Sequence, residues 1–453
     1  MFIVDTKGSL LVEVLLALAI AAIACTAIAS GYLGSLAAAE TLKNNEELRY
    51  ETRGMLEDAR VAARMDFGGL VNTTRIDEKY TKKITVENID DMTKDISVQV
   101  SFIGSEKRSA ELATRFFDWR HAEGAKLCDF EGDWSAPRLH GFISLGASTT
   151  ATQIAKQGHF IYIAADSSVQ DKSDFFIVDV FDVDHPFIVS QLNTGPGILA
   201  LAVAGNYVYA GNSSINAQLQ IIDVKNPTQP ILVSSYKLPG VYNDGTTIAN
   251  TLYYSKSRIF LGTKKSMIAE LHMIDVTDPF SPFELGTWEA NTAVNALRAN
   301  GTMLLVASPD SEELKVLDIS NPALITRIGG FDAAGNSGNG KSLYSIGTTT
   351  YLGRTFGNNE LYTLVAASSS LSTISSVQIG ASVQDLVAGN NLLILATSDA
   401  SKELQIFSVT DAAHPTPVAS LDFPAKAHSL GCGNNVLYVG LESSDALRII
   451  TPQ

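Results

Sequence analysis

One glutamate stands inside the most apolar stretch of the chain. Residues 9–30 read "SLLVEVLLALAIAAIACTAIAS", and residues 14–39 carry no charge. As a helix, this charge-free stretch would be about 39 Å long at ~1.5 Å per residue, enough to cross a hydrocarbon core of ~30 Å. A carboxylate at the edge of such a segment costs roughly 2.5–3.5 kcal/mol and usually marks function. Glu13 is therefore the first residue whose presence needs a chemical reason.

Two simple interpretations account for the apolar run but not for Glu13. A secretory signal needs a basic start and a small-residue cleavage site. The stretch "ACTAIASG" offers such a site, but the start "MFIVDTKG" holds one Lys and one Asp. The second interpretation is a plain transmembrane anchor. Neither explains a carboxylate at this place.

The order of features resembles the type IV pilin and type II secretion pseudopilin family. A short polar leader ends in Lys7-Gly8, the apolar run follows, and Glu13 is its fifth residue counted from Ser9. The resemblance implies that a prepilin peptidase cleaves after Gly8 and that the same enzyme N-methylates Ser9. Residues 10–12 suit the family, although phenylalanine is commoner than serine at the first mature position.

Cleavage would give Glu13 a partner. It exposes an α-amine at Ser9, and such amines have a pKa of about 7.7–8.0 in short peptides. In hydrocarbon, both this amine and the Glu13 carboxylate need an opposite charge. The amine of a subunit shifted by one helix step would supply it, so Glu13 would select the axial register of assembly. The expected partners are other pilin or pseudopilin subunits, the prepilin peptidase and inner-membrane lipid.

The rest of the chain offers few residues at catalytic or metal-binding spacing. The seven histidines are scattered, the three cysteines form no C-x-x-C, and no G-x-S-x-G occurs. The acids of "DVDH" (Asp182, Asp184) and the stretch "NSGNGK" do not follow the EF-hand pattern. We therefore expect no cofactor, no metal and no enzymatic activity. A net charge of −15 without a Lys/Arg cluster speaks against nucleic acid as a partner.

The first part of the chain predicts a helix and a small sheet. Residues 35–65, "SLAAAETLKNNEELRYETRGMLEDARVAARM", are rich in helix formers with an apolar stripe. A separate helix after a bend at Gly31 or Gly34 fits equally well. Ile96, Val98 and Val100 alternate with polar residues, as half-buried strands do. The predicted parts are a leader (1–8), a long helix (9–65, with a membrane or filament core at 9–36), a pilin-like β head (66–120) and a linker (121–136).

The remaining residues, 137–453, repeat one motif seven times. Clear copies are "FFIVDVFDVDHP", "LQIIDVKNPTQP", "LHMIDVTDPFSP" and "LKVLDISNP", and weaker copies place Val365, Ser408 and Thr451 at the position of the Asp. Each unit of 43–52 residues holds about four short strands joined by Gly/Asn turns, which predicts a seven-bladed β-propeller. The Asp residues are expected to support turns rather than catalysis. The motifs resemble the LVIVD repeat family, which says little about activity because propellers host many functions.

The last unit ends at Gln453 without its outer strand. Residues 137–147, "PRLHGFISLGA", resemble the outer strands of other units and are expected to complete the ring. This pairing would bring Cys128 close to Cys432, with a disulfide and two free thiols as the open alternatives. Cys25 is expected to pack within the apolar helix.

The predicted fold class is therefore mainly β with a long N-terminal helix. That helix and a small antiparallel sheet would precede a seven-bladed propeller closed by an N-terminal strand. The predicted function is a minor pilin-like subunit that displays the propeller for adhesion to a surface protein or glycan. It would sit in the bacterial inner membrane by a single pass and then in a pilus at the cell surface. The alternatives are a secretion pseudopilin with a cargo-binding propeller and an anchored propeller enzyme.

The assembly role of Glu13 predicts a selective defect. Glu13→Ala should still be cleaved after Gly8, because the leader is intact, yet it should be about tenfold depleted from sheared filaments, since its carboxylate no longer sets register. Mass spectrometry of the mature chain checks the cleavage, and immunoblots of sheared filaments check the incorporation. Normal incorporation of the variant would remove the role.

Overall fold

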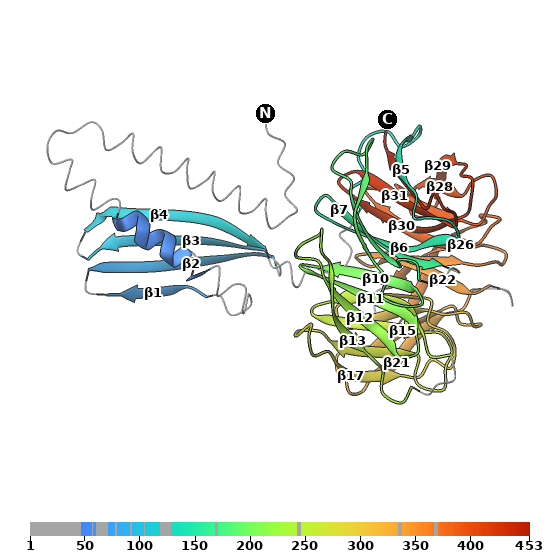
Figure 1. Cartoon of the computed structure of the whole chain (residues 1–453), viewed down its shortest axis with the longest axis horizontal. Helices are drawn as coiled ribbons and strands as arrows, with labels where there is room; N and C mark the ends of the chain where they lie inside the picture. Colours follow the sequence, from blue (N-terminus) through green and yellow to red (C-terminus); the bar gives the residue numbers. More distant parts are fainter. Residues whose placement is uncertain are drawn as a thin grey trace. The chain divides into compact units, whose positions relative to one another are not determined.

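The computed structural model describes residues 47–56, 58–59, 71–77, 79–90, 93–103, 105–117, 128–167, 171–241, 246–333, 338–366 and 370–453. The chain divides into two compact units, Met1–Ala122 and Glu123–Gln453. Each unit has its own core and is described by itself (Figure 1).

The first unit contains one antiparallel sheet of four strands in the order β1-β2-β3-β4. The strands are β1 (Thr73–Ile76), β2 (Tyr80–Asp90), β3 (Thr93–Phe102) and β4 (Ser105–Phe117). A helix, residues 47–56 and 58–59, packs Leu48 and Leu56 onto the side chains of Val98 and Val100 in β3. The Lys82 ammonium ties the sheet to the helix through Glu51, 2.6 Å away.

The predicted fold class needs a correction. Among the residues that the structure describes, helix is confined to residues 47–56 and 58–59, while 32 strands make up most of the fold. The long N-terminal helix is therefore wrong as a statement of fold class. Helix propensity alone gives marginal helices, and the observed one lies where an apolar stripe is buried against a sheet. Residues 9–46, 57 and 60–65 of the predicted helix lie outside the described residues.

The predicted location also needs a correction. Within the described ranges, no helix combines the length and the apolar character required to cross a membrane. This finding overturns the assignment to a single-pass inner-membrane protein. Residues 9–36, from which that assignment came, are not among the described residues.

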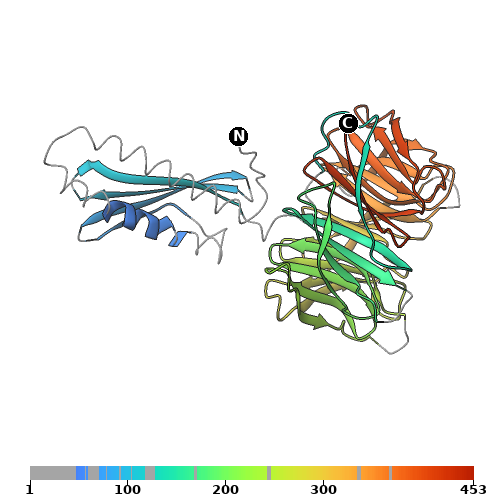
Figure 2. The ribbon, with the colours of Figure 1, turned by 45° about the horizontal axis from the view of Figure 1, so that its top comes forward.

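The second unit is a ring of seven four-stranded antiparallel sheets, the blades of a β-propeller (Figure 2). The first strands of neighbouring blades contact one another around the centre of the ring. These inner strands are β6 (Thr149–Gln157), β10 (Ile198–Ala204), β14 (Ala249–Ser255), β18 (Ala296–Asn300), β22 (Gly340–Ile346), β26 (Val383–Gly389) and β30 (Ala427–Gly433).

The other strands follow outward in each blade. The second strands are β7 (Phe160–Ser167), β11 (Tyr207–Ser214), β15 (Arg258–Thr263), β19 (Met303–Ala307), β23 (Thr349–Arg354), β27 (Leu392–Thr397) and β31 (Val436–Leu441). The third strands are β8 (Phe175–Asp179), β12 (Ala217–Asp223), β16 (Leu271–Asp275), β20 (Leu314–Asp318), β24 (Leu361–Ala366), β28 (Leu404–Ser408) and β32 (Leu447–Thr451). The outer strands are β9 (Phe187–Leu192), β13 (Ile231–Tyr236), β17 (Phe283–Trp288), β21 (Thr326–Phe331), β25 (Leu371–Val377), β29 (Thr416–Leu421) and β5 (Arg138–Ile143).

Repeated small and apolar residues let the blades pack against each other. Every inner strand buries one aliphatic side chain at the same position: Ile154, Leu201, Leu252, Leu297, Leu343, Leu386 and Leu430. Four of the seven second strands carry glycine where the next blade approaches, and the other three carry alanine. A Cβ on Gly262 would lie 2.5 Å from Val294, and one on Gly353 would lie 2.6 Å from Val383. The Gly in motifs such as "IFLG" and "TYLG" therefore sets the blade-to-blade distance.

The strand that precedes the first blade closes the ring. β5 pairs antiparallel with β32, the last strand of the chain, and so completes the seventh blade. His140 of β5 adds two contacts, one at 2.7 Å to Asp184 of blade 1 and one at 2.7 Å to Thr451 of β32. The propeller part of the prediction, including its closing strand, is thus confirmed by the sheet topology.

The residues just before β5 belong to the propeller core. Phe130 and Trp134 are buried and pack in an edge-to-face pair, with ring centroids 5.0 Å apart. They share an apolar cluster with Leu393 of β27 and Leu437 of β31. The second half of the predicted linker, 121–136, therefore packs against blades 6 and 7.

Trp134→Ala is expected to lower the free energy of unfolding of the propeller by about 3–5 kcal/mol, since it removes a large buried side chain and leaves a cavity. Urea denaturation of the full chain measures this loss. Phe181→Ala is the matched control, because Phe181 is 86% exposed and its loss should change stability by no more than about 0.5 kcal/mol. Equal effects of the two substitutions would contradict the packing of this segment.

Candidate functional site

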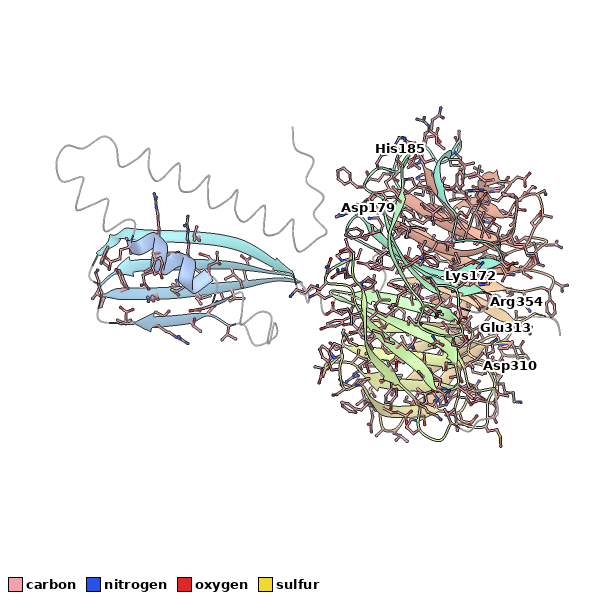
Figure 3. All side chains as sticks on the ribbon, viewed as in Figure 1. Lys172, Asp179, His185, Asp310, Glu313 and Arg354 are labelled. Carbon is pink, nitrogen blue, oxygen red and sulfur yellow. A yellow bond between two sulfur atoms is a disulfide. The ribbon has the colours of Figure 1, made fainter. Side chains whose placement is uncertain are left out.

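The two ends of the propeller have different loops. In each blade the connection from the outer strand to the next inner strand, and the turn between second and third strands, lie at one end, which we call the loop face. The turn between third and outer strands lies at the opposite end. Figure 3 shows Lys172, Asp310, Glu313 and Arg354 of the loop face on one side, and Asp179 and His185 on the other.

The repeated motif Asp lies at the end opposite to the loop face. The carboxylates of Asp179, Asp223, Asp275 and Asp318 each accept a hydrogen bond from the backbone N–H two residues on, at 2.8 Å in all four turns. Each is an Asx turn that starts the connection to the outer strand. The predicted structural role of the motif acids is therefore confirmed.

A second set of polar side chains holds the loop face together. In six blades a buried Asp, Glu or Gln next to the start of the third strand accepts a hydrogen bond from a backbone N–H 20 residues later, in the loop that leads to the next blade. These residues are Asp174, Gln218, Glu270, Glu313, Glu360 and Glu403, all at most 5% exposed. We call them the loop clamps. Blade 7 has Ala446 at this position.

Burial shifts the pKa of two of the clamp carboxyl groups. Burial raises the pKa of Asp174 to about 6, although hydrogen bonds from Thr194 act in the opposite direction. Burial also raises the pKa of Glu270, and the neighbouring Glu289 carboxyl adds to the shift. Such acids stabilise their loops by accepting backbone N–H groups that would otherwise be buried without a partner.

Blades 4 and 5 are joined at the loop face by a buried ion pair. The Arg354 guanidinium lies 2.6 Å from the Glu313 carboxylate, and the two side chains are 0% and 2% exposed. Nη1 of Arg354 donates to the Asn359 carbonyl at 2.9 Å. Removing one partner of such a pair usually costs about 3–5 kcal/mol, because the other charge stays buried. The pair therefore fixes the two blades rather than offering reactive groups.

The inner strands carry a β-bulge at the loop face. In six of the seven inner strands, one residue near the loop face is skipped in the pairing with the second strand. That residue has no partner residue on the second strand. These bulge residues are Thr152, Leu199, Asn250, Lys341, Gln384 and His428. Bulges re-aim a side chain and are common beside functional sites. Six of the inner strands therefore have an irregular residue at their loop-face end, and its type differs between blades.

Deeper along the inner strands, charged and aromatic side chains come together. The Arg298 guanidinium carbon lies 5.3 Å from the ring centre of Tyr253 and 5.1 Å from that of Tyr344, a double cation–π contact across three blades. Asp385 of β26 accepts the backbone N–H of Leu430 at 2.8 Å. Burial raises the pKa of Asp385, while the charges of Arg298 and His428 oppose that shift.

The residues that the sequence singled out fall into two groups. Cys128 and Cys432 are joined in a disulfide with their Cα atoms 5.5 Å apart, at the end of β30 remote from the loop face. The cleavage pair Gly8 and Ser9 and the assembly residue Glu13 lie outside the described residues. In the described part of the chain, no three His, Cys, Asp or Glu residues are grouped to hold a metal ion.

Sequence reasoning missed the clamps and the bulge residues. The sequence does carry a signal for the clamps. When the seven units are aligned, each clamp lies five residues before the motif position, as Asp174 does before Asp179. Their partners lie about 20 residues further on, in loops with no shared sequence. The bulge residues share no residue type, and only the ladder register identifies them.

Comparisons with known proteins support the fold. The LVIVD repeat model matches residues 200–237 and 304–332. No curated protein matches the sequence. Among solved structures, a chain of the mitotic checkpoint complex matches with a TM-score of 0.54 and 13% identity, covering 73% of this chain and 98% of its own. A periplasmic gluconolactonase of Pseudomonas aeruginosa matches with a TM-score of 0.51 and 11% identity, covering 83% and 100% of the two chains.

At these identities the structural matches establish the propeller fold alone. They do not extend to a pilin-like leader, to assembly into filaments or to a ligand. One of the two matched structures is an enzyme, and so the expectation that this chain is not an enzyme stays a prediction.

The clamp at Asp174 predicts a pH dependence. Folding raises the pKa of this carboxyl from 3.8 to about 6 and so favours its protonated form. Its contribution to stability is present below pH 3.8 and is lost as the pH rises through about 6. Asp174→Asn removes this titration, so the free energy of unfolding of the variant minus that of the wild type should rise by about 2 kcal/mol from pH 4 to pH 7.

Urea denaturation across that pH range makes the measurement. Asp318→Asn is the control, because a backbone hydrogen bond from Ser320 lowers the pKa of Asp318. Its stability difference should change with the opposite sign, at and below pH 3.8. A flat difference for Asp174→Asn between pH 4 and pH 7 would contradict the burial of an acid at this site.

Proposed function

We propose that the chain is a pilin-like filament subunit whose propeller is a binding module. The observation that carries the binding role is the loop face, where six blades hold their loops with buried side chains. A loop fixed in this way loses little conformational entropy when a ligand binds, because it is already ordered. The outward side chains of these loops remain available for contact.

The clamps themselves favour binding over catalysis. Their carboxyl groups are at most 5% exposed and point at backbone N–H groups within the protein. A general acid or base must reach the substrate proton within hydrogen-bond distance. Groups that are enclosed and already hydrogen-bonded serve as supports for a surface.

The pilin-like role comes from the leader. In this role a prepilin peptidase cleaves between Gly8 and Ser9, Ser9 is N-methylated, and Glu13 pairs with a neighbouring subunit. A propeller of more than 300 residues would crowd a filament if every subunit carried one, which favours a minor subunit. The alternative is a secretion pseudopilin whose propeller holds exported cargo.

Filament fractions test both parts of the proposal. Fractions from cells that produce the full chain are compared with fractions from cells that produce residues 1–122, using retention on an array of glycans and proteins. Both fractions should contain the subunit with Ser9 as its first residue, and only the full chain should give retention, by a margin of about tenfold. Absence of the chain from filaments would contradict the subunit role, and equal retention would contradict the binding role.

A further inference from the structure

Three neighbouring blades depart from the rest at the bulge position. In the other blades this position joins its blade to the next: Thr152 donates to the Ile198 carbonyl at 2.6 Å, and Asn250 to the Val294 carbonyl at 2.8 Å. Asn295, directly before β18, donates in the same way to the Gly340 carbonyl at 2.7 Å. Blade 2 has the apolar Leu199 instead. The usual task of a polar side chain here is therefore structural.

In blades 5 and 7 the next residue takes over that task. Ser342 donates to the Val383 carbonyl at 3.1 Å, and Ser429 donates to the Ala151 carbonyl at 2.8 Å. In blade 6, Asp385 reaches blade 7 by accepting the Leu430 N–H at 2.8 Å. The bulge residues of these blades, Lys341, Gln384 and His428, are thereby released from joining the blades.

The released side chains have unused hydrogen-bond donors. Within the described part of the chain, the Lys341 ammonium and the Gln384 amide make no hydrogen bond or ion pair, although both side chains are half-buried. His428 uses Nδ1 toward the Glu442 carboxylate at 3.3 Å, which leaves Nε2. The Lys341 and Gln384 side chains are only partly buried, so water can reach these donors, and a ligand oxygen would take the place of that water.

Charged side chains of both signs act on these donors. Lys264 adds a second positive charge near Lys341, because its repulsion contributes to the lowered pKa of Lys341, which burial dominates. Asp385 and Glu442 also act on Lys341 and oppose that shift. These two acids would repel a dianion such as phosphate. The Glu442 oxygens would accept hydroxyl groups from a ligand that presents a single carboxylate.

We propose that Lys341, Gln384 and His428 form a binding site for the carboxylate of an acidic sugar at the loop-face mouth of the ring. The Lys341 ammonium and the Gln384 amide donate to the carboxylate, and Glu442 accepts a sugar hydroxyl. This inference rests on the proposed function in that it treats the propeller as a binding module.

Isothermal titration of the purified full chain with D-glucuronate tests the site. We expect saturable binding of glucuronate and none of D-glucose, which has the hydroxyls but no carboxylate. Lys341→Met should weaken glucuronate binding at least tenfold, since it removes a charge-assisted hydrogen bond and keeps an apolar stem of similar length. Lys402→Met is the matched control, because Lys402 is an exposed lysine in a turn of the same loop face, and it should leave binding unchanged.

Three results would overturn the site. The first is the absence of saturable binding by the folded wild-type chain. The second is equal weakening by Lys341→Met and Lys402→Met, which would mean attraction to the surface as a whole. The third is equal affinity for cyclohexanecarboxylate, which has a single carboxylate but no sugar hydroxyls. The titration uses purified protein and one sugar, whereas the retention experiment uses filaments and many ligands. Failure of the glucuronate site would therefore not by itself contradict the proposed function.

Discussion

The pairing of β5 with β32 is the contact on which the second unit depends. Without it, the seventh blade would have three strands instead of four, and β32 would be left as an unpaired edge. The closing strand comes from the start of the unit and the strand it joins from its end, so closure links the two ends of the fold. The Cys128–Cys432 disulfide strengthens this link, because it ties the segment before β5 to the inner strand β30 of the same blade.

Ring closure places the two ends of the propeller under different constraints. At the end with the motif turns, acids such as Asp223 bond within their own turn and need nothing from the next blade. At the loop face, the clamps bond to loops that lead to the next blade, as Glu403 does with the N–H of Phe423 at 2.8 Å. The loop face is therefore ordered by contacts that run around the ring, and there the blades differ from one another.

Much of the propeller was predictable because its signals are local. The turn before each second strand and the apolar third strand lie close together in the sequence and recur seven times, and the Asx turn that follows them recurs four times. The clamps were not predicted because their partners lie in loops with no shared sequence. The Arg354–Glu313 pair was not predicted because its two residues lie 41 positions apart, in different blades. The long helix was wrong because helix formers in residues 35–65 say nothing about packing, and the described helix extends only where Leu48 and Leu56 meet a sheet.

Hydrogen exchange of the closing strands tests this account most directly. Mass spectrometry of the oxidised full chain should show residues 447–451 and 138–143 exchanging as slowly as residues 404–408 and 416–421, the equivalent pair in blade 6. Exchange of residues 447–451 at the rate of an unprotected chain, while residues 404–408 stay protected, would show that β5 does not close the ring.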